Sequence, residues 1–509
     1  MKQLQGQSVL VLGLGNSGLA MARWCARCGA QVTVADTREQ PPMLAALREQ
    51  VPGARFVHGA LDAALLQSAD FRAVFRSPGL APAQTAALLQ HAQQASLWCA
   101  GELALFSQAL RDLREALSYA PQVLAITGTN GKTTVTALTG QLIARAGLSV
   151  ALAGNIGPTL LDTLARTLDA QQAGTALPQV WVLELSSFQL DGVQGFEPSA
   201  ATVLNLSQDH LDWHGSMRAY AEAKARIFGE HALMVLNRDD PLVMAMLPDP
   251  VRLKGGRLQQ RAHLGFGVGM PTRPGDYGLE TVNGMTWLVR AQEADETMRR
   301  RRDEEAELHI QRLMPAEALR IRGRHNATNA LAALALAASA GAPLAPMLHG
   351  LREYRGEPHR VEPLGIVREV EYFDDSKGTN VGASVAAIEG LGEQRKLVLI
   401  MGGDGKGQDF SPLAGPLARH ARAVVLIGRD APRIREAMAG SAVPLHEAAS
   451  MEDAVRQCAA LAQPGDAVLM SPACASFDMF DNYPHRARVF RAAVAALAQD
   501  AGVELEVGT

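Results

Sequence analysis

Several features are scarce in this sequence of 509 residues, and each scarcity excludes a class of protein. The five cysteines are few and odd in number, which predicts no disulfide framework. Lys and Arg (48) do not outnumber Asp and Glu (52), so no nucleic-acid partner is expected. No apolar run approaches the roughly 20 residues that a membrane span needs. The first apolar run, Val9–Leu12, ends in glycines and predicts a strand, not a signal peptide. We therefore expect a cytoplasmic protein.

Two of the cysteines, Cys25 and Cys28, have the spacing of a redox motif. They fall in an expected helix behind a glycine turn. A plain packing role is the better interpretation.

What the sequence does contain is a repeated order of apolar strand, glycine-bearing loop and helix. This order predicts the α/β class with parallel sheets. The length predicts three consecutive domains, which we place at 1–117, 118–356 and 357–509. The first and third resemble Rossmann domains, and the central one resembles a P-loop ATPase. The expected strands lie at 8–12, 31–35, 123–126, 180–185, 201–206, 396–401, 423–428 and 467–471.

A densely charged segment at 291–307 interrupts the central domain, with four consecutive arginines followed by acids. The acids neutralise the arginines, so a solvated hairpin or helical insertion is expected.

The first glycine loop has the pattern Gly13-x-Gly15-x-x-Gly18, with Asp36 about 20 residues further on. This is the fingerprint of a dinucleotide site, and taken alone it would predict an NAD enzyme. The same loop geometry binds any diphosphate at a helix N-terminus, including that of a UDP-sugar.

The second glycine loop runs from Thr127 to Thr133 between a strand and a helix. Its glycines admit phosphate close to the backbone, Lys132 adds a full positive charge, and the Thr133 hydroxyl can bind Mg²⁺. Ile126 stands where a strict P-loop has its first glycine, so the loop is a variant. It predicts a nucleotide triphosphate site.

Two further strands end in groups that suit a metal. Glu184 closes the 180–185 strand, and His210 follows the 201–206 strand. A carboxylate at this edge of a parallel sheet suits Mg²⁺, and ligands gather there. His210 and His214 are four residues apart, but no HExxH motif or thiolate accompanies them, which argues against zinc. Lys224 lies in an expected helix, where solvation is the alternative to a role in the site.

The loop Gly128-Thr-Asn-Gly-Lys-Thr, together with the later motifs, resembles the Mur ligases and folylpolyglutamate synthetases. The resemblance spans essentially the whole chain, and it is strongest to the D-glutamate-adding branch of the Mur ligase family. It implies catalytic roles for Lys132, Lys224, His210 and Glu184, and metal contacts from Thr133, Glu184, His210 and Lys224. It also implies that Lys224 is carbamylated and that two Mg²⁺ ions bind.

The resemblance implies substrate contacts as well. The implied ATP-binding residues are Gly128, Thr129, Asn130, Gly131, Lys132, Thr133, Thr134, Asn326, Asn329, Arg360 and Asp375. The implied UDP-substrate residues are Asn16, Ser17, Asp36, Thr37, Arg38, Ser77, Pro78, Gly79, Asn155 and Gln189. The implied amino-acid residues are Lys377, Thr379, Lys406, Ser476, Phe477 and Tyr483.

The implied activity is ATP-dependent addition of D-glutamate to UDP-N-acetylmuramoyl-L-alanine through an acyl phosphate, in peptidoglycan precursor synthesis. A monomer without a membrane span is expected. Alternatives remain open at this point: another Mur ligase or a folylpolyglutamate synthetase, a nucleotide-sensing module without chemistry, or an NAD-dependent dehydrogenase.

Overall fold

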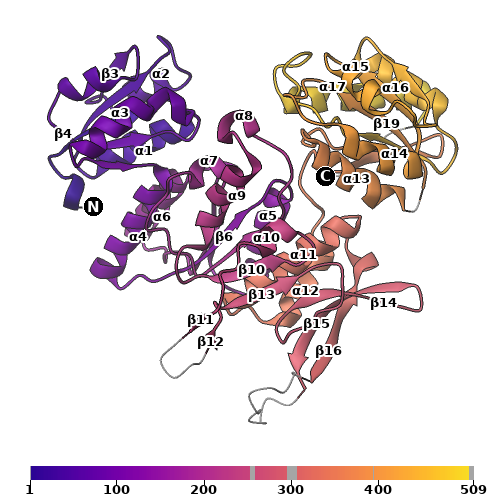
Figure 1. The fold of residues 1–509 in the computed structure, drawn as a ribbon, viewed down its shortest axis with the longest axis horizontal. Coiled ribbons are helices and arrows are strands. Elements are labelled where there is room, and N and C mark those ends of the chain that lie inside the picture. The colour runs from indigo at the N-terminus through magenta and orange to yellow at the C-terminus, as the bar shows by residue number, and fades with distance from the viewer. Residues whose placement is uncertain (1, 253–257, 295–306, 394, 504–509) are drawn as a thin grey trace.

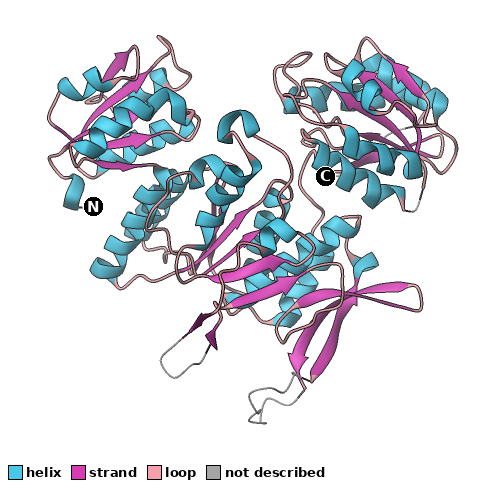
Figure 2. Ribbon diagram, in the orientation of Figure 1, coloured by secondary structure: helices cyan, strands magenta, loops and turns pink. Residues whose placement is uncertain are grey.

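A computed structural model describes residues 2–252, 258–294, 307–393 and 395–503. Three α/β units follow one another along the chain (Figure 1). The first and third lie at the two upper corners of the view, and the central unit lies below them. In each unit helices cover a mainly parallel sheet (Figure 2), as the repeated strand–loop–helix order predicts.

The first sheet is fully parallel, with the order β3-β2-β1-β4-β5. Its strands are β1 (Ser8–Leu12), β2 (Gln31–Asp36), β3 (Arg55–His58), β4 (Phe71–Arg76) and β5 (Trp98–Ala100). Its helices are α1 (Asn16–Arg27), α2 (Leu44–Gln50) and α3 (Pro82–Gln94). Apolar β1 is buried along almost its whole length, which fits its place in the middle of the sheet.

The central sheet is also parallel, with the order β13-β10-β9-β6-β8-β7. Its strands are β6 (Gln122–Thr127), β7 (Val150–Gly154), β8 (Val180–Glu184), β9 (Ala200–Val203), β10 (Leu233–Asn237) and β13 (His263–Phe266). Strand β6 lies between β8 and β9, so the loops that follow these three strands meet at one edge of the sheet.

Helices of the central unit cover both faces of that sheet. They are α5 (Lys132–Arg145), α6 (Leu160–Gln172), α7 (Ser187–Leu190), α8 (Leu211–His214), α9 (Met217–Ala225), α10 (Pro241–Met244), α11 (Arg324–Ser339) and α12 (Leu344–Glu353). Helix α4 (Glu102–Leu117) leads from the first unit into the central one and packs against both α1 and α6. Alanine-rich α11 packs closely against α5 because its small side chains allow the two helices to approach.

Two small antiparallel sheets project from the central unit (Figure 1). One pairs β11 (Val251–Arg252) with β12 (Leu258–Gln259), and the other contains β14 (Tyr277–Val282), β15 (Met285–Glu293) and β16 (Leu308–Pro315). Antiparallel pairing of β15 with β16 agrees with a hairpin at the charged segment. Most of that segment, 295–306, lies outside the described residues.

The third sheet has the order β17-β18-β22-β19-β20-β21, and only β17 runs antiparallel. Its strands are β17 (Glu362–Val367), β18 (Val370–Asp374), β19 (Leu397–Gly402), β20 (Ala421–Ile427), β21 (Leu445–Glu447) and β22 (Ala467–Met470). Its helices are α13 (Val381–Gly392), α14 (Ala414–His420), α15 (Ala431–Ala437), α16 (Met451–Leu461) and α17 (Tyr483–Asp500).

The cores of the three units are not equally separate. One buried apolar cluster runs from Val9 and Met21 of the first unit to Leu160 and Trp181 of the central unit, where α4 packs on both α1 and α6. The third unit has clusters of its own on the two faces of its sheet. No helix among the described residues is long and apolar enough to cross a membrane.

The predicted α/β class and the expected strands are confirmed, with ends that differ by at most three residues. Cys25 is buried in α1, as a packing role predicts, and burial raises the pKa of its thiol.

Candidate active site

The phosphate loop joins β6 to α5 and is shaped by two glycines. Gly128 has φ 151° and Gly131 has φ 82°, backbone conformations that side chains rarely adopt. Lys132 is the first residue of α5, and its Nζ donates to the carbonyls of Gly128 (2.8 Å) and Thr129 (2.8 Å). The amine is thus folded over its own loop. Desolvation lowers the pKa of Lys132, although the nearby carboxylate of Glu184 opposes that shift.

Lys224 reaches the same loop from α9 and is buried, so the alternative of a solvated helix lysine is wrong. Its Nζ donates to the Thr127 hydroxyl (3.0 Å) and to the Gly128 carbonyl (2.9 Å). Burial, reinforced by the charge of Lys132, lowers the pKa of Lys224 well below its usual value. A neutral amine is therefore available beside the phosphate loop.

Glu184 ends β8 next to the phosphate loop and is 2% exposed. Its Oε1 accepts a hydrogen bond from Asn155 Nδ2 (3.0 Å). Its Oε2 is buried and has no hydrogen-bond partner. A buried carboxylate oxygen without a partner is costly, so the site suits a hard cation that would bind it.

His210 follows β9 in a left-handed conformation (φ 54°) that turns the chain into α8. Its Nε2 lies 3.6 Å from Asp209 Oδ2, and its ring packs edge-on against Phe188. Burial lowers the pKa of His210, with Asp209 opposing and nearby lysines reinforcing the shift. The imidazole is held neutral, as a metal ligand must be. His214 instead pairs with the hydroxyl of Ser187 (2.9 Å).

The third unit contributes side chains to the same loop. Arg360 Nη2 donates to the Thr133 hydroxyl (2.6 Å), and Lys377 Nζ lies 3.5 Å from the same oxygen. Burial, together with the charge of Arg360, lowers the pKa of Lys377 to about 8. Asn380 forms a reciprocal amide pair with Asn130 of the loop.

A cavity opens beside the phosphate loop between the central and third units. Its walls include Gly131, Thr134, Asn326, Asn329, Arg360, Asp375 and Lys377. Asn326 and Asn329 lie in the first two turns of α11, whose N-cap is Gly323, so neither is the helix cap. Burial raises the pKa of Asp375 to about 7 even though Ser471 donates to its carboxylate (2.7 Å). Seven of the eleven predicted nucleotide residues, from both units, thus line one cavity, whereas Gly128, Thr129, Lys132 and Thr133 lie in the adjoining phosphate loop and do not line it.

His359, Glu362 and Asp374 also lie close enough together to hold a metal. Arg491 pairs with both carboxylates, and His359 Nδ1 is 2.8 Å from Asp374 Oδ2. This cluster is an ion-pair network that holds the chain on either side of Arg360.

Five of the residues predicted for the UDP-substrate lie at the first glycine loop and at the end of β2. Asn16 and Ser17 begin α1, and Thr37 and Arg38 are exposed beyond β2. Asp36 is buried and accepts hydrogen bonds from the Leu14 amide (2.7 Å) and from Arg38. Burial would raise the pKa of Asp36, but these hydrogen bonds outweigh it and lower the pKa to about 2. Its carboxylate therefore orders the loop.

A second cavity lies between the first and central units. Pro78 and Gln189 line it, and Ser77 and Gly79 flank Pro78 in the loop after β4. Asn155 does not line this cavity and instead donates to Glu184 beside the phosphate loop. The predicted UDP-substrate residues are therefore divided between two units, with Asn155 next to the phosphate loop.

Residues predicted for the amino acid fall into two neighbouring groups. Lys377 Nζ lies 5.7 Å from the centre of the Tyr483 ring, and Thr379 is two residues beyond Lys377. Lys406 is exposed after β19, and Ser476 follows a short bridge that pairs Asp404 with Ala475. Phe477 is 71% exposed. The charge of Lys406 contributes to the lowered pKa of His210.

Sequence reasoning missed three side chains of this site. Asp209 and Asn380 contact each other (3.4 Å), and the Tyr220 hydroxyl lies 3.2 Å from that of Thr129. Asp209 stands beside His210 in the sequence, which was a usable signal. Asn380 gives only the local signal of a helix cap, because its partners in the site are 171 and 250 residues away.

Comparison with known proteins matches the chain along most of its length. The model of the Mur ligase MurD-like N-terminal domain matches residues 7–101, that of the Mur ligase middle domain matches 126–253, and that of the glutamate ligase domain of Mur ligases matches 359–474. The chain is 66% identical over 99% of both chains to the UDP-N-acetylmuramoylalanine–D-glutamate ligase of Albidiferax ferrireducens. It is 57% identical over 98% of both chains to the protein of the same name from Burkholderia multivorans.

Solved structures share the fold at lower identity. The MurF ligase of Thermotoga maritima, crystallised with ADP, aligns with a TM-score of 0.56 at 16% identity over 98% of this chain and 97% of that one. The UDP-N-acetylmuramate–alanine ligase MurC of the same organism gives 0.54 at 19% identity over 96% and 99%. With close relatives over its full length and family models in all three units, the chain belongs to the Mur ligase family.

Proposed function

We propose that this protein adds D-glutamate to UDP-N-acetylmuramoyl-L-alanine with hydrolysis of ATP, a step of peptidoglycan precursor synthesis. One observation carries the proposal: Lys132, Arg360 and Lys377, from two units, converge on the phosphate loop beside the buried carboxylate of Glu184. The family is ATP-dependent, and the full-length relatives bear the name of this D-glutamate ligase.

The nucleotide would occupy the cavity between the central and third units. Asn326 and Asn329 would contact adenine, Asp375 the ribose, and Arg360 with Lys132 the phosphates. Gly128, Thr129, Asn130, Gly131, Thr133 and Thr134 would surround the phosphates with loop and helix amides.

Two Mg²⁺ ions fit the groups at the loop. Thr133 would bind one, and Glu184, His210 and a carbamylated Lys224 would hold the other. The unpartnered Oε2 of Glu184 and the neutral form of His210 support this assignment. The neutral amine of Lys224 is the form that CO₂ can attack. When bound, the ions would neutralise charge that develops on the phosphates.

The remaining substrates would lie on either side of this centre. The UDP moiety would bind at Asn16, Ser17, Asp36, Thr37 and Arg38 under the 77–79 loop, and its peptide end would reach Asn155 and Gln189. D-Glutamate would bind between Lys377, Thr379, Lys406, Ser476, Phe477 and Tyr483, whose cations and hydroxyls suit two carboxylates.

This assignment divides the chain into a UDP-sugar domain (1–117), an ATP domain (118–356) and an amino-acid domain (357–509). We propose that the protein acts as a monomer. Its nucleotide substrates assign the reaction to the cytoplasm.

The chemistry follows from the positions of the groups. A carboxylate oxygen of the L-alanyl group attacks the γ-phosphorus, the bond to ADP breaks, and an acyl phosphate forms. Lys132 and Arg360 stabilise the transferring phosphoryl group. The D-glutamate amine then attacks the acyl carbon, and the tetrahedral intermediate expels phosphate. Because catalysis is mainly positioning, the third unit must be docked for both steps.

The test is phosphate release from ATP, Mg²⁺ and UDP-N-acetylmuramoyl-L-alanine with a panel of amino acids. We expect release that depends on D-glutamate, and loss of nearly all release in Lys132→Ala. Lys396→Ala is the matched control, because Lys396 is exposed and its Nζ bonds the Arg419 carbonyl away from the phosphate loop. Release that depends on another amino acid would reassign the acceptor, and full activity of Lys132→Ala would overturn the site.

A further inference from the structure

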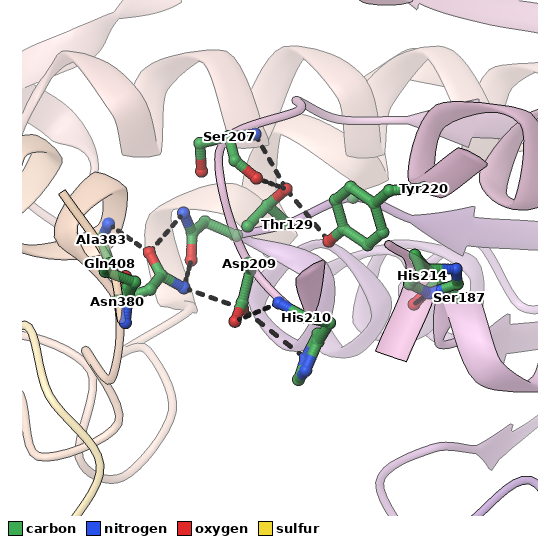
Figure 3. Close-up of polar contacts among 12 residues, drawn as sticks. Thr129, Ser187, Ser207, Asp209, His210, His214, Tyr220, Asn380, Ala383 and Gln408 are labelled. Carbon is green, nitrogen blue, oxygen red and sulfur yellow. Dashed lines mark hydrogen bonds and ion pairs between the residues drawn. The ribbon is translucent and has the colours of Figure 1, made fainter. Parts of the chain in front are cut away.

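Asn380 uses every hydrogen-bonding position of its side chain and is 5% exposed. Its Oδ1 accepts from the Ala383 amide (2.9 Å), which caps α13, and from Asn130 Nδ2 (3.2 Å). Its Nδ2 donates to Asn130 Oδ1 (3.0 Å) and to Asp209 Oδ2 (3.4 Å). A side-chain amide offers two donors and two acceptor positions, so all four are filled. Figure 3 shows these contacts converging on Asn380.

The neighbours of this amide determine its orientation. The Ala383 N–H can only donate, so the atom facing it must be the oxygen. The Asp209 carboxylate accepts, so the atom facing it must be the nitrogen. Flipping the Asn380 amide would break both contacts at once. The arrangement is therefore specific to asparagine at this position.

The two partners of Asn380 in the central unit lie in the segments that carry the reacting groups. Asn130 lies in the phosphate loop, where its backbone amide donates to Asn205 Oδ1 (2.9 Å). Asp209 adjoins His210 and lies 3.6 Å from its ring nitrogen. One side chain of the third unit thus contacts both the phosphate loop and the histidine segment.

The start of α13 packs closely against the central unit. A Cβ at Gly382 would come within 2.7 Å of the Ser207 hydroxyl and 3.3 Å of Asn130 Nδ2. The start of α13 therefore lies directly on the 205–209 segment and the loop. Asn380 makes these contacts only when the third unit is docked as in this structure.

We propose that Asn380 is a positioning residue that links docking of the third unit to the arrangement of the phosphate loop and the His210 segment. This inference rests on the ligase function proposed above. Asn380 contacts neither ATP nor the reacting carboxylate in this scheme. It acts through Asn130 and Asp209, which lose a partner whenever the third unit moves away.

The test must separate this link from the ordinary capping of α13. Asn380→Ser keeps a good cap but cannot reach Asn130 or Asp209. Asn380→Asp keeps the acceptor for Ala383 and sets a carboxylate against that of Asp209. The control is Ser450→Ala, which removes the cap of α16 in the same unit, where Ser450 accepts from the Asp453 amide (3.2 Å).

Three quantities are measured: kcat for phosphate release, the Mg²⁺ concentration for half-maximal rate, and the radius of gyration by X-ray scattering without substrates. For Asn380→Ser and Asn380→Asp we expect kcat to fall about 10- to 100-fold. We also expect a higher Mg²⁺ requirement and a larger radius of gyration than for wild type. Ser450→Ala should match wild type in all three, because loss of a cap alone changes neither the metal requirement nor the docking.

Wild-type kinetics and scattering in Asn380→Ser would overturn the inference, since capping alone would then explain the residue. If the wild-type protein releases no phosphate, the proposed function fails. The scattering comparison still decides the inference in that case: a larger radius of gyration in Asn380→Ser supports the docking link, and an unchanged one refutes it.

Discussion

At the scale of single residues, the site combines groups whose charges are disfavoured by burial with groups that lack partners. Lys224 is buried beside another lysine, and Glu184 has a free buried oxygen. Each arrangement costs stability in the protein alone and becomes favourable only when a ligand supplies the missing charge. Several groups that destabilise the folded protein lie at one loop, which indicates that they are there for binding and chemistry.

Lys224 tests the proposed carbamate. Lys224→Ala should lose nearly all phosphate release, and Lys224→Arg should not restore it, because a guanidinium stays charged and cannot react with CO₂. The direct measurement is ¹³C NMR after incubation with ¹³C-bicarbonate. A carbamate signal is expected in wild type and absent in both variants. A fully active Lys224→Arg protein would contradict the assignment.

Glu184 tests the metal site. Glu184→Gln keeps the oxygen that accepts from Asn155 but loses the charge, so the Mg²⁺ concentration for half-maximal phosphate release should rise at least about tenfold. Asp276→Asn removes another buried carboxylate of the central unit, one that accepts from the Gly265 amide (2.6 Å) outside the cavity. It should leave the Mg²⁺ requirement unchanged. Equal effects of the two substitutions would indicate general destabilisation.

From the lowered pKa of Lys377 we predict that nucleotide binding depends on pH. Its pKa is lowered to about 8, so the amine of the free protein is charged below that pH and neutral above it. Lys377 lines the nucleotide cavity, and a bound phosphate favours its charged form. Above pH 8, ADP binding must therefore be accompanied by uptake of a proton from solution, and the Kd should rise by up to about tenfold per pH unit. Arginine stays charged, so Lys377→Arg should show a flatter rise in titrations from pH 7 to 10. Parallel curves for the two proteins would rule out this role for Lys377.

At the scale of secondary-structure elements, the phosphate loop depends on the backbone at the start of α5. Gly131 and Gly147 flank this helix with the same φ of 82°. A Cβ at Gly131 would come within 2.8 Å of Asn329 Oδ1, whereas a Cβ at Gly147 would meet nothing within 4 Å. The two glycines thus share a backbone cost and differ only in what surrounds them.

This pair gives a matched test. Gly131→Ala and Gly147→Ala should each lower the free energy of unfolding by about 1–2 kcal/mol, the cost of a left-handed alanine. Only Gly131→Ala should also weaken ADP binding, because the new methyl displaces Asn329 from the adenine wall. Calorimetric titration measures the binding and urea unfolding measures the stability. Equal ADP affinity in the two variants would contradict the assignment of Asn329 to the nucleotide site.

Features within one secondary-structure element or loop could be predicted from the sequence, whereas contacts between distant elements could not. The loop from Thr127 to Thr133 is local in sequence, and the apolar strands around it have clear patterns, so the α/β fold and the groups at Lys132 and Glu184 could be predicted. The burial of Lys224 and the contacts of Asn380 could not, because they depend on packing between distant segments. The metal, the carbamate and the substrate roles came from family resemblance, and they remain proposals.

At the scale of the whole molecule, the units are joined in two different ways. The first and central units share an apolar cluster through α4, α1 and α6. The third unit keeps separate clusters, and the side-chain contacts that Arg360, Lys377 and Asn380 make with the phosphate loop are polar. Shared apolar burial couples unfolding strongly, whereas each hydrogen bond contributes only about 0.5–1.5 kcal/mol.

This difference predicts two transitions in calorimetry of the full chain, one for the first and central units together and one for the third. ADP with Mg²⁺ binds across the second junction, so at 100 times its Kd it should stabilise the protein by about 2.7 kcal/mol and bring the two transitions closer together. UDP-N-acetylmuramoyl-L-alanine, bound between the first two units, should raise only their transition. A single two-state transition without ligands, with equal calorimetric and van't Hoff enthalpies, would mean that the polar contacts at the phosphate loop already couple the third unit to the rest.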